Sequence, residues 1–151
     1  RPMDVEDKNS LLDIQNRLLL PIHDQIDIKK SRGGLIHTEF TLQISLLRRG
    51  LFPTDSSLRG LIEALGRSDG ALCERLAANY AFLRAHQQLL ILLSDSSAQS
   101  FSVANESFRK LSLIDKSTPE ELFNRIHAVL NDQEALLKEL DAFGGPFKIE
   151  G

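Results

Sequence analysis

The sequence has no tryptophan, one tyrosine, one cysteine and no long apolar run. With so few aromatic side chains, a stacking platform for single-stranded nucleic acid is not expected. The single cysteine, Cys73, excludes an internal disulfide and a cysteine-based zinc site. The longest apolar run, Leu89–Leu93, is far shorter than a membrane span, so we expect no direct membrane insertion. No signal peptide is visible, which favours a cytoplasmic protein, with an extracytoplasmic domain of a membrane receptor as the alternative.

Signatures of catalysis and of cofactor binding are missing as well. None of the histidines, His23, His37, His86 and His127, stands at helical ligand spacing from another histidine or from the cysteine. The chain also lacks a glycine-rich nucleotide loop and a nucleophile elbow. Its net charge of −3 creates no overall field that would attract nucleic acid. We therefore expect no enzyme activity, no metal or other cofactor, and no nucleic-acid partner.

One enzymatic alternative depends on closely spaced arginine and histidine residues, a pair that some helical RNA-cleaving domains carry. Arg32–His37 and Arg17–His23 have such a spacing. The polar residue that usually follows the arginine in those domains is absent here, because Gly33 and Leu18 occupy that position. A helical RNA-cleaving domain is therefore kept only as a second alternative function.

The residues that are present suit one globular domain. The chain has 151 residues, of which 42% are hydrophobic and 26% charged, as is typical of a folded rather than a disordered protein. This length can bury a substantial core. We expect one helical bundle domain over residues 3–143, and interpret residues 1–2 and 144–151 as linker or remnants of an expression tag.

Helical periodicity dominates the chain and predicts an all-α, single-domain bundle of five or six helices. The last helix also has apolar residues at the alternating spacing of a coiled coil. Thr118 is its expected cap, Pro119 its first residue, and Glu121 the partner in a capping box. The expected helices are Ser10–Lys30 with a kink at Pro21, a helix in 35–49, a short helix from a cap at Asp55 or Ser56 to about Arg67, Leu72–Leu93, a helix with Phe101, Ala104, Phe108 and Leu111 on one stripe, and Pro119 to about Phe143.

Residues 35–49 are ambiguous, because apolar and polar residues alternate there with the period of a strand. No second strand is predicted that could pair with this one, so a helix that contacts two neighbours is favoured. If the segment were a strand, it would pair with its copy in a second subunit. Arg48, Arg49 and Gly50 are typical of a helix C-terminus.

The central segment Leu72–Leu93 carries polar residues in the middle of its apolar face. Arg75, Asn79 and His86 lie between two apolar ridges, and Glu39 holds a similar position in 35–49. Because an unpartnered buried polar group costs roughly 1–3 kcal/mol, we expect each to have a partner. The favoured interpretation is a polar layer through the bundle core, which Gln15 and Gln133 would extend. The alternative is a polar pocket or interface, in which the anion facing Arg75 would be Glu39, another chain or a ligand.

A small basic loop is the second candidate site. Lys29, Lys30, Arg32, Gly33 and Gly34 follow one another closely, and free backbone N–H groups there could bind a phosphate or a carboxylate. The spacing matches no phosphate-binding motif, so an ordinary helix stop at the glycines is the favoured interpretation.

The function that these observations favour is a non-catalytic protein–protein interaction module, such as an adaptor, a chaperone-like protein or a regulatory bundle. Apolar helix surface is abundant, and part of it could cover a partner helix or form a homodimer. The first alternative is a ligand-sensing helical domain of a membrane receptor, with Arg75, Asn79 and His86 binding a small anion.

Overall fold

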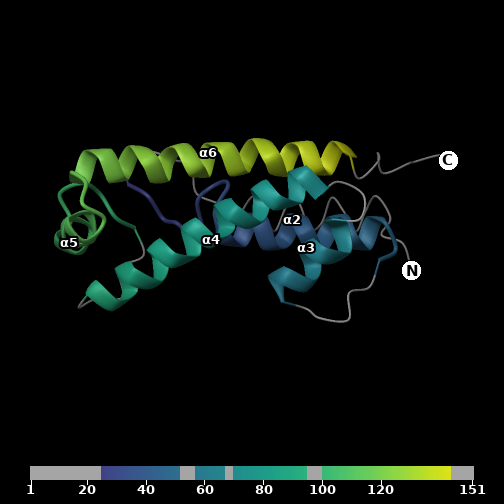
Figure 1. Ribbon diagram of the computed structural model, residues 1–151, viewed down its shortest axis with the longest axis horizontal. Coiled ribbons are helices and arrows are strands. Elements are labelled where there is room, and N and C mark those ends of the chain that lie inside the picture. The colour runs from purple at the N-terminus through teal and green to yellow at the C-terminus, as the bar shows by residue number, and fades with distance from the viewer. Residues whose placement is uncertain (1–24, 52–56, 67–69, 95–99, 144–151) are drawn as a thin grey trace.

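The computed structural model describes residues 25–51, 57–66, 70–94 and 100–143, and in these residues it has five α-helices and no β-sheet (Figure 1). An all-α, single-domain bundle is therefore confirmed. The interpretations of residues 1–24 and 144–151, Gln15, Arg17 and His23 among them, lie outside the described residues. The helices are α2 (Leu35–Arg48), α3 (Leu58–Gly66), α4 (Gly70–Leu93), α5 (Glu106–Ile114) and α6 (Pro119–Phe143).

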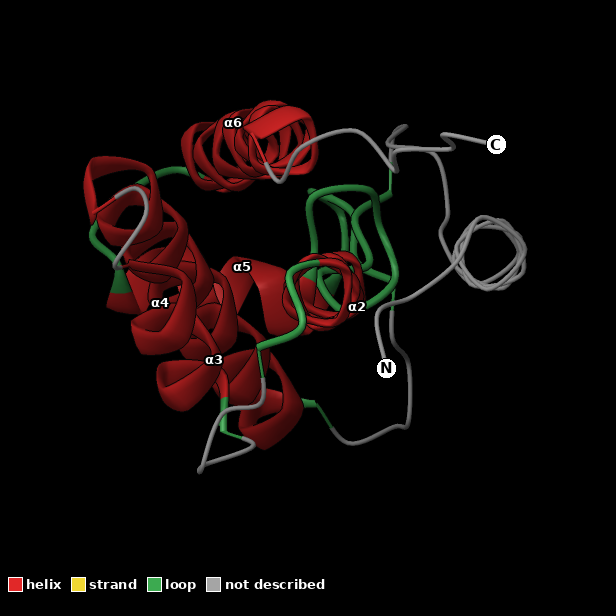
Figure 2. Cartoon of the chain, turned by 90° about the vertical axis from the view of Figure 1, so that its right-hand side faces the viewer, coloured by secondary structure: helices red, strands yellow, loops and turns green. Residues whose placement is uncertain are grey.

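Helices α4 and α6 are the two longest and run in opposite directions along the molecule (Figure 1). Helix α2 lies beside them, and the end-on view places α2, α4 and α6 around a shared interior (Figure 2). Helix α4 buries side chains at alternating spacings of three and four residues, which is the spacing of coiled-coil packing. These are Cys73, Leu76, Tyr80, Leu83, Gln87 and Leu90.

The core consists of two apolar clusters with a polar junction between them. One cluster joins α4, α5 and α6, and the other joins α2, α3, α4 and α6. Between them lies Gln133, which is fully buried and donates to Thr38 Oγ1 at 3.1 Å and to the Leu76 carbonyl at 3.2 Å. A single amide thus links three helices, which sets their register. Gln133 therefore occupies the core, as the predicted polar layer requires.

Residues 35–49 form a helix and not a strand, as favoured from the sequence. The alternation of polar and apolar residues has a simple cause: α2 contacts α3, α4 and α6, so it is buried on more than one side. Its buried residues accordingly include polar ones, Thr38, Thr41 and Ser45. The helix ends at Arg48 with Arg49 as cap and Gly50 at φ 65°, as predicted.

Two predicted helix boundaries are wrong. The first helix was expected to continue to Lys30, but Ile26 instead pairs with Phe101 in an isolated antiparallel bridge, with N–O distances of 2.7 and 2.8 Å. Phe101 was expected on a helical stripe, yet α5 begins only at Glu106, where Asn105 Oδ1 accepts the N–H of Phe108. Both bridge residues are 1% exposed, so long-range burial and pairing outweigh their local helical period.

Local capping follows the sequence at α6, whereas α3 is capped by a residue other than the two that were predicted. Thr118 Oγ1 accepts the N–H of Glu121 at 3.1 Å, and α6 begins at Pro119 as predicted. At α3 the capping hydroxyl belongs to Ser57, which accepts the N–H of Gly60 at 3.2 Å. The proposed caps Asp55 and Ser56 lie outside the described residues.

Candidate functional site

The anion that faces Arg75 is Asp132 of α6. Arg75 NH2 lies 3.0 Å from Asp132 Oδ1, and Asn79 Nδ2 donates to Oδ2 of the same carboxylate at 2.8 Å. Asp132 thus binds two neighbouring turns of α4 to α6. Glu39, a second chain and a ligand were the partners considered from the sequence, and Asp132 was not among them. Arg75 is also 60% exposed, so it lies at the rim of the α4–α6 contact and not inside the core.

His86 does not join Arg75 and Asn79. Its Nδ1 lies 2.7 Å from the carbonyl oxygen of Phe82, and the centroids of the two rings are 4.1 Å apart with their planes tilted by 36°. Because a carbonyl can only accept, Nδ1 is the donor in this contact. The three residues singled out from the sequence therefore form two separate contacts, and no pocket for a small anion is built from all three.

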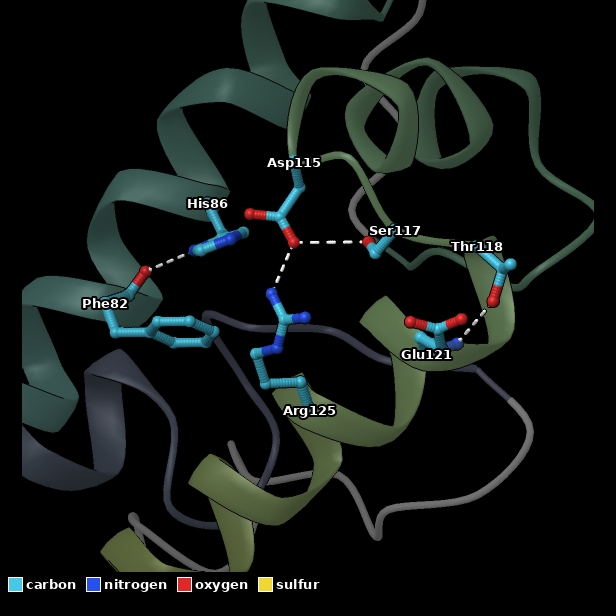
Figure 3. A network of polar contacts seen from close by, with 7 residues as sticks. All are labelled: Phe82, His86, Asp115, Ser117, Thr118, Glu121 and Arg125. Carbon is cyan, nitrogen blue, oxygen red and sulfur yellow. Dashed lines mark hydrogen bonds and ion pairs between the residues drawn. The ribbon is translucent and has the colours of Figure 1, made fainter.

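Beyond His86, the turn between α5 and α6 holds a polar network (Figure 3). The Asp115 carboxylate accepts from Arg125 of α6 and from the Ser117 hydroxyl, the latter at 3.2 Å. Lys116 lies between them with φ 56°, the only positive φ among the described non-glycine residues. The ion pair and the Thr118 cap hold this turn in place, so the left-handed residue at its centre is maintained.

Glu39 has its own partner on α4. Its carboxylate accepts the Tyr80 hydroxyl at 2.7 Å. Burial and, to a smaller extent, the hydrogen bond from Tyr80 to Glu39 raise the pKa of Tyr80 to about 12. Tyr80 is 6% exposed, so this pair links α2 to α4 near the polar junction and is not open to a substrate.

The basic loop directs its backbone donors inward. The N–H groups of Lys29 and Lys30 donate to Asp27 Oδ1 at 3.1 and 2.9 Å. Gly34 donates to the Ser31 carbonyl, and Gly33 donates to His37 Nδ1 at 2.8 Å. The anion bound by this loop is thus Asp27 of the chain itself, which is 4% exposed. The glycines precede α2 and do not end a helix.

His37 is buried in this loop, which bears on the arginine–histidine pair of RNA-cleaving domains. The residue is 8% exposed and its Nδ1 is occupied by the Gly33 N–H. Burial lowers the pKa of His37 to about 4, and the positive charges of Arg32 and Lys138 act in the same direction. Such an imidazole is neutral near pH 7 and lacks access to a substrate, which is the opposite of what general acid–base catalysis needs.

Several residues that shape these contacts were not identified from the sequence. Asp132 and Asp27 had no local signal, because a carboxylate on a helix or in a turn looks the same whether it is solvated or bound. The exposure of Leu113 and Ile114 could not be predicted from the sequence either, since exposed apolar residues are common on protein surfaces. The positive φ of Lys116 also had no local signal, because glycine is the usual residue in this conformation at a helix end.

Three further observations bear on function. No group of histidine, cysteine or acidic side chains in the described residues is arranged to hold a metal ion. No helix in the same residues is long and apolar enough to cross a membrane. Comparisons with protein-family models, with curated proteins and with solved structures found no match for this chain.

The Asp132 contact makes a first testable prediction. We expect Asp132→Ala to lower the free energy of unfolding by less than about 1 kcal/mol, because both ionic partners are substantially exposed and exposed pairs are weak. Urea denaturation followed by circular dichroism measures this change. Glu63→Ala breaks the still more exposed Arg59–Glu63 pair and serves as the matched control. A loss above roughly 2 kcal/mol for Asp132→Ala would show that Asp132 is a core contact.

Proposed function

We propose that this chain is a non-catalytic protein–protein interaction module, an adaptor, chaperone-like or regulatory bundle. The observation that carries the proposal is the exposure of aliphatic side chains at one end of the molecule. Ile91 and Leu92 end α4 and are 58% and 80% exposed, while Leu113 and Ile114 end α5 and are 77% and 58% exposed. Both helix ends lie at the end of the molecule opposite α3 (Figure 1). The two pairs supply exposed aliphatic surface at one end of the molecule, and contiguous surface of this kind is typical of sites that bind other proteins.

The polar side chains support a non-catalytic role. Three side chains singled out from the sequence have partners within the chain: Glu39 with Tyr80 of α4, His37 with Gly33, and His86 with the Phe82 carbonyl of its own helix. A catalytic group needs an open approach for substrate and a pKa suited to proton transfer. His37 and Tyr80 are buried, and burial lowers the pKa of His37 to about 4, so binding is favoured over chemistry.

Affinity capture from the source cell tests the proposal. The immobilised wild-type chain should recover one or more specific proteins at physiological salt. A variant with Ile91, Leu92, Leu113 and Ile114 all changed to serine should lose them, because it removes the exposed aliphatic surface without touching buried positions. Leu51→Ser, at a less exposed residue after α2, is the matched control and should recover the same proteins.

Light scattering of the purified chain separates a homodimer from binding to another protein. Recovery of no protein by the wild-type chain, together with a monomeric mass, would refute the proposal.

A further inference from the structure

Helix α5 (Glu106–Ile114) is apolar on two opposite sides, and only one of them is covered. Its inner side carries Phe108 and Leu111, which are 0% and 1% exposed in the core. Its outer side ends in Leu113 and Ile114, both among the most exposed aliphatic residues of the described chain. A nine-residue helix does not need an outer aliphatic pair in order to pack. The outer pair is therefore available to a partner.

The same outer side is basic. Arg109 and Lys110 precede the aliphatic pair and Lys116 follows it, against two carboxylates: Glu106, and Asp115, which pairs with Arg125 of α6. Lys110 and Glu106 lie 3.4 Å apart in an exposed pair, whereas neither Arg109 nor Lys116 forms an ion pair with any residue that the structure describes. The chain as a whole carries a net charge of −3. Although the chain as a whole is acidic, the cations of α5 and Lys116 attract an acidic partner to this face.

Lys116 adds an independent observation. It sits directly after α5 at φ 56°, and the N–H of Ser117 bonds back to the Ser112 carbonyl at 2.9 Å, as at a helix end where glycine is preferred. A lysine in this conformation costs on the order of 1 kcal/mol relative to glycine. The Asp115–Arg125 ion pair keeps the turn closed around it (Figure 3). The lysine therefore lowers the conformational stability of this turn relative to glycine, but it places a cation beside the aliphatic pair.

We propose that the outer face of α5 binds an acidic amphipathic helix of a partner protein. Aliphatic residues of that helix cover Leu113 and Ile114, and its carboxylates pair with Arg109, Lys110 and Lys116. This inference depends on the proposed interaction function and names the chemistry of the partner. An anionic membrane surface fits less well. A flat surface would also meet Glu120 and Glu121, both exposed in the first turn of α6, whereas a single helix can lie across α5 alone.

Two synthetic peptides test the binding chemistry directly. The probe is a fluorescent helical peptide with leucines on one face and glutamates on the other, and its control has lysine in place of every glutamate. Fluorescence anisotropy should show binding of the acidic peptide, weakened by added salt, and no binding of the lysine peptide. The double variants R109E/K110E and L113S/I114S should each weaken binding about tenfold or more. Arg59→Glu, on the exposed side of α3, is the matched charge control and should leave the affinity unchanged.

Lys116→Gly separates binding from stability. Glycine relieves the positive φ, so the melting temperature should rise by a few degrees, while loss of the cation should weaken binding of the acidic peptide several-fold. If Lys116 had only a structural role, Lys116→Gly would not raise the melting temperature and weaken peptide binding at the same time. If Lys116→Gly binds as tightly as the wild-type chain, the role assigned to Lys116 is wrong.

The remaining outcomes decide between surfaces. Equal binding of the two peptides, or equal loss from R109E/K110E and Arg59→Glu, would overturn the α5 assignment. So would binding to phosphatidylserine vesicles without binding to the acidic peptide. If the L113S/I114S chain still recovers the cellular partner, the interaction function stands and the α5 surface is wrong. If the wild-type chain recovers no protein from cells but binds the acidic peptide, the interaction function is wrong and the chemistry of the α5 surface stands.

Discussion

Gly33→Ala is expected to lower the free energy of unfolding by roughly 3 kcal/mol or more, since strain and overpacking act together at this residue. Gly33 has φ +78°, a conformation that costs an alanine about 1–2 kcal/mol. An added Cβ would also lie 1.9 Å from the carbonyl oxygen of Leu130 and 3.0 Å from the backbone nitrogen of Glu134. Both atoms belong to the backbone of α6, which cannot shift without breaking its own hydrogen bonds. Urea denaturation followed by the helical circular dichroism signal measures the loss.

Gly50→Ala is the matched control for this substitution. Gly50 has a similar φ of +65°, but an added Cβ would meet nothing within 4 Å. Its cost should therefore be only the conformational part, about 1 kcal/mol. The difference between the two variants measures how closely the loop before α2 packs on α6. Equal losses for Gly33→Ala and Gly50→Ala would show that the close approach does not exist in solution.

The stability of the protein should fall between pH 6.5 and pH 4 because of His37. Burial lowers the pKa of this histidine from 6.5 to about 4 in the folded chain. As the pH falls through this window, the unfolded chain takes up a proton while the folded chain does not, so protons favour unfolding. Above pH 6.5 the neutral, buried His37 makes its full contribution to the free energy of unfolding, and below pH 4 this contribution is lost. A shift of this size corresponds to about 3 kcal/mol of unfolding free energy.

His37→Asn isolates this contribution from other titrating groups. The amide oxygen of asparagine can accept the Gly33 N–H that His37 Nδ1 accepts at 2.8 Å, but it does not titrate. The difference in unfolding free energy between wild type and variant should be constant above pH 6.5 and should change by about 3 kcal/mol in favour of the variant by pH 4. Urea titrations across the pH range supply both curves. Parallel curves would mean that His37 is solvated and takes up its proton near pH 6.5 in the folded chain.

Much of the helical organisation could be predicted from the sequence, because helix formation depends on local period and local caps. Thr118 and Pro119 begin α6 as predicted, and Arg48 to Gly50 end α2 as predicted. The predictions of helix were wrong where a contact with a distant part of the chain outweighed the local helical period. Ile26 and Phe101 fit helical stripes, but each is buried by pairing with the other across the chain.

The candidate sites could be predicted much less well than the helices. Periodicity placed Arg75, Asn79 and His86 on one side of α4, but it could not show which residue of another helix each one meets. That depends on the rotation and register of α4 against α6, which bring Asp132 to Arg75 and Asn79 and leave His86 beside Phe82.

The sequence by itself determined the all-α class, most helix ends and the apolar faces, because these follow from interactions within about one helical turn. Only the tertiary structure decided which polar groups are satisfied internally and which aliphatic side chains remain outside. Asp27 and Gly33 belong to the first group, while Leu113 belongs to the second. The physical reason is that burial and pairing are properties of two surfaces together, and the second surface comes from a distant part of the chain.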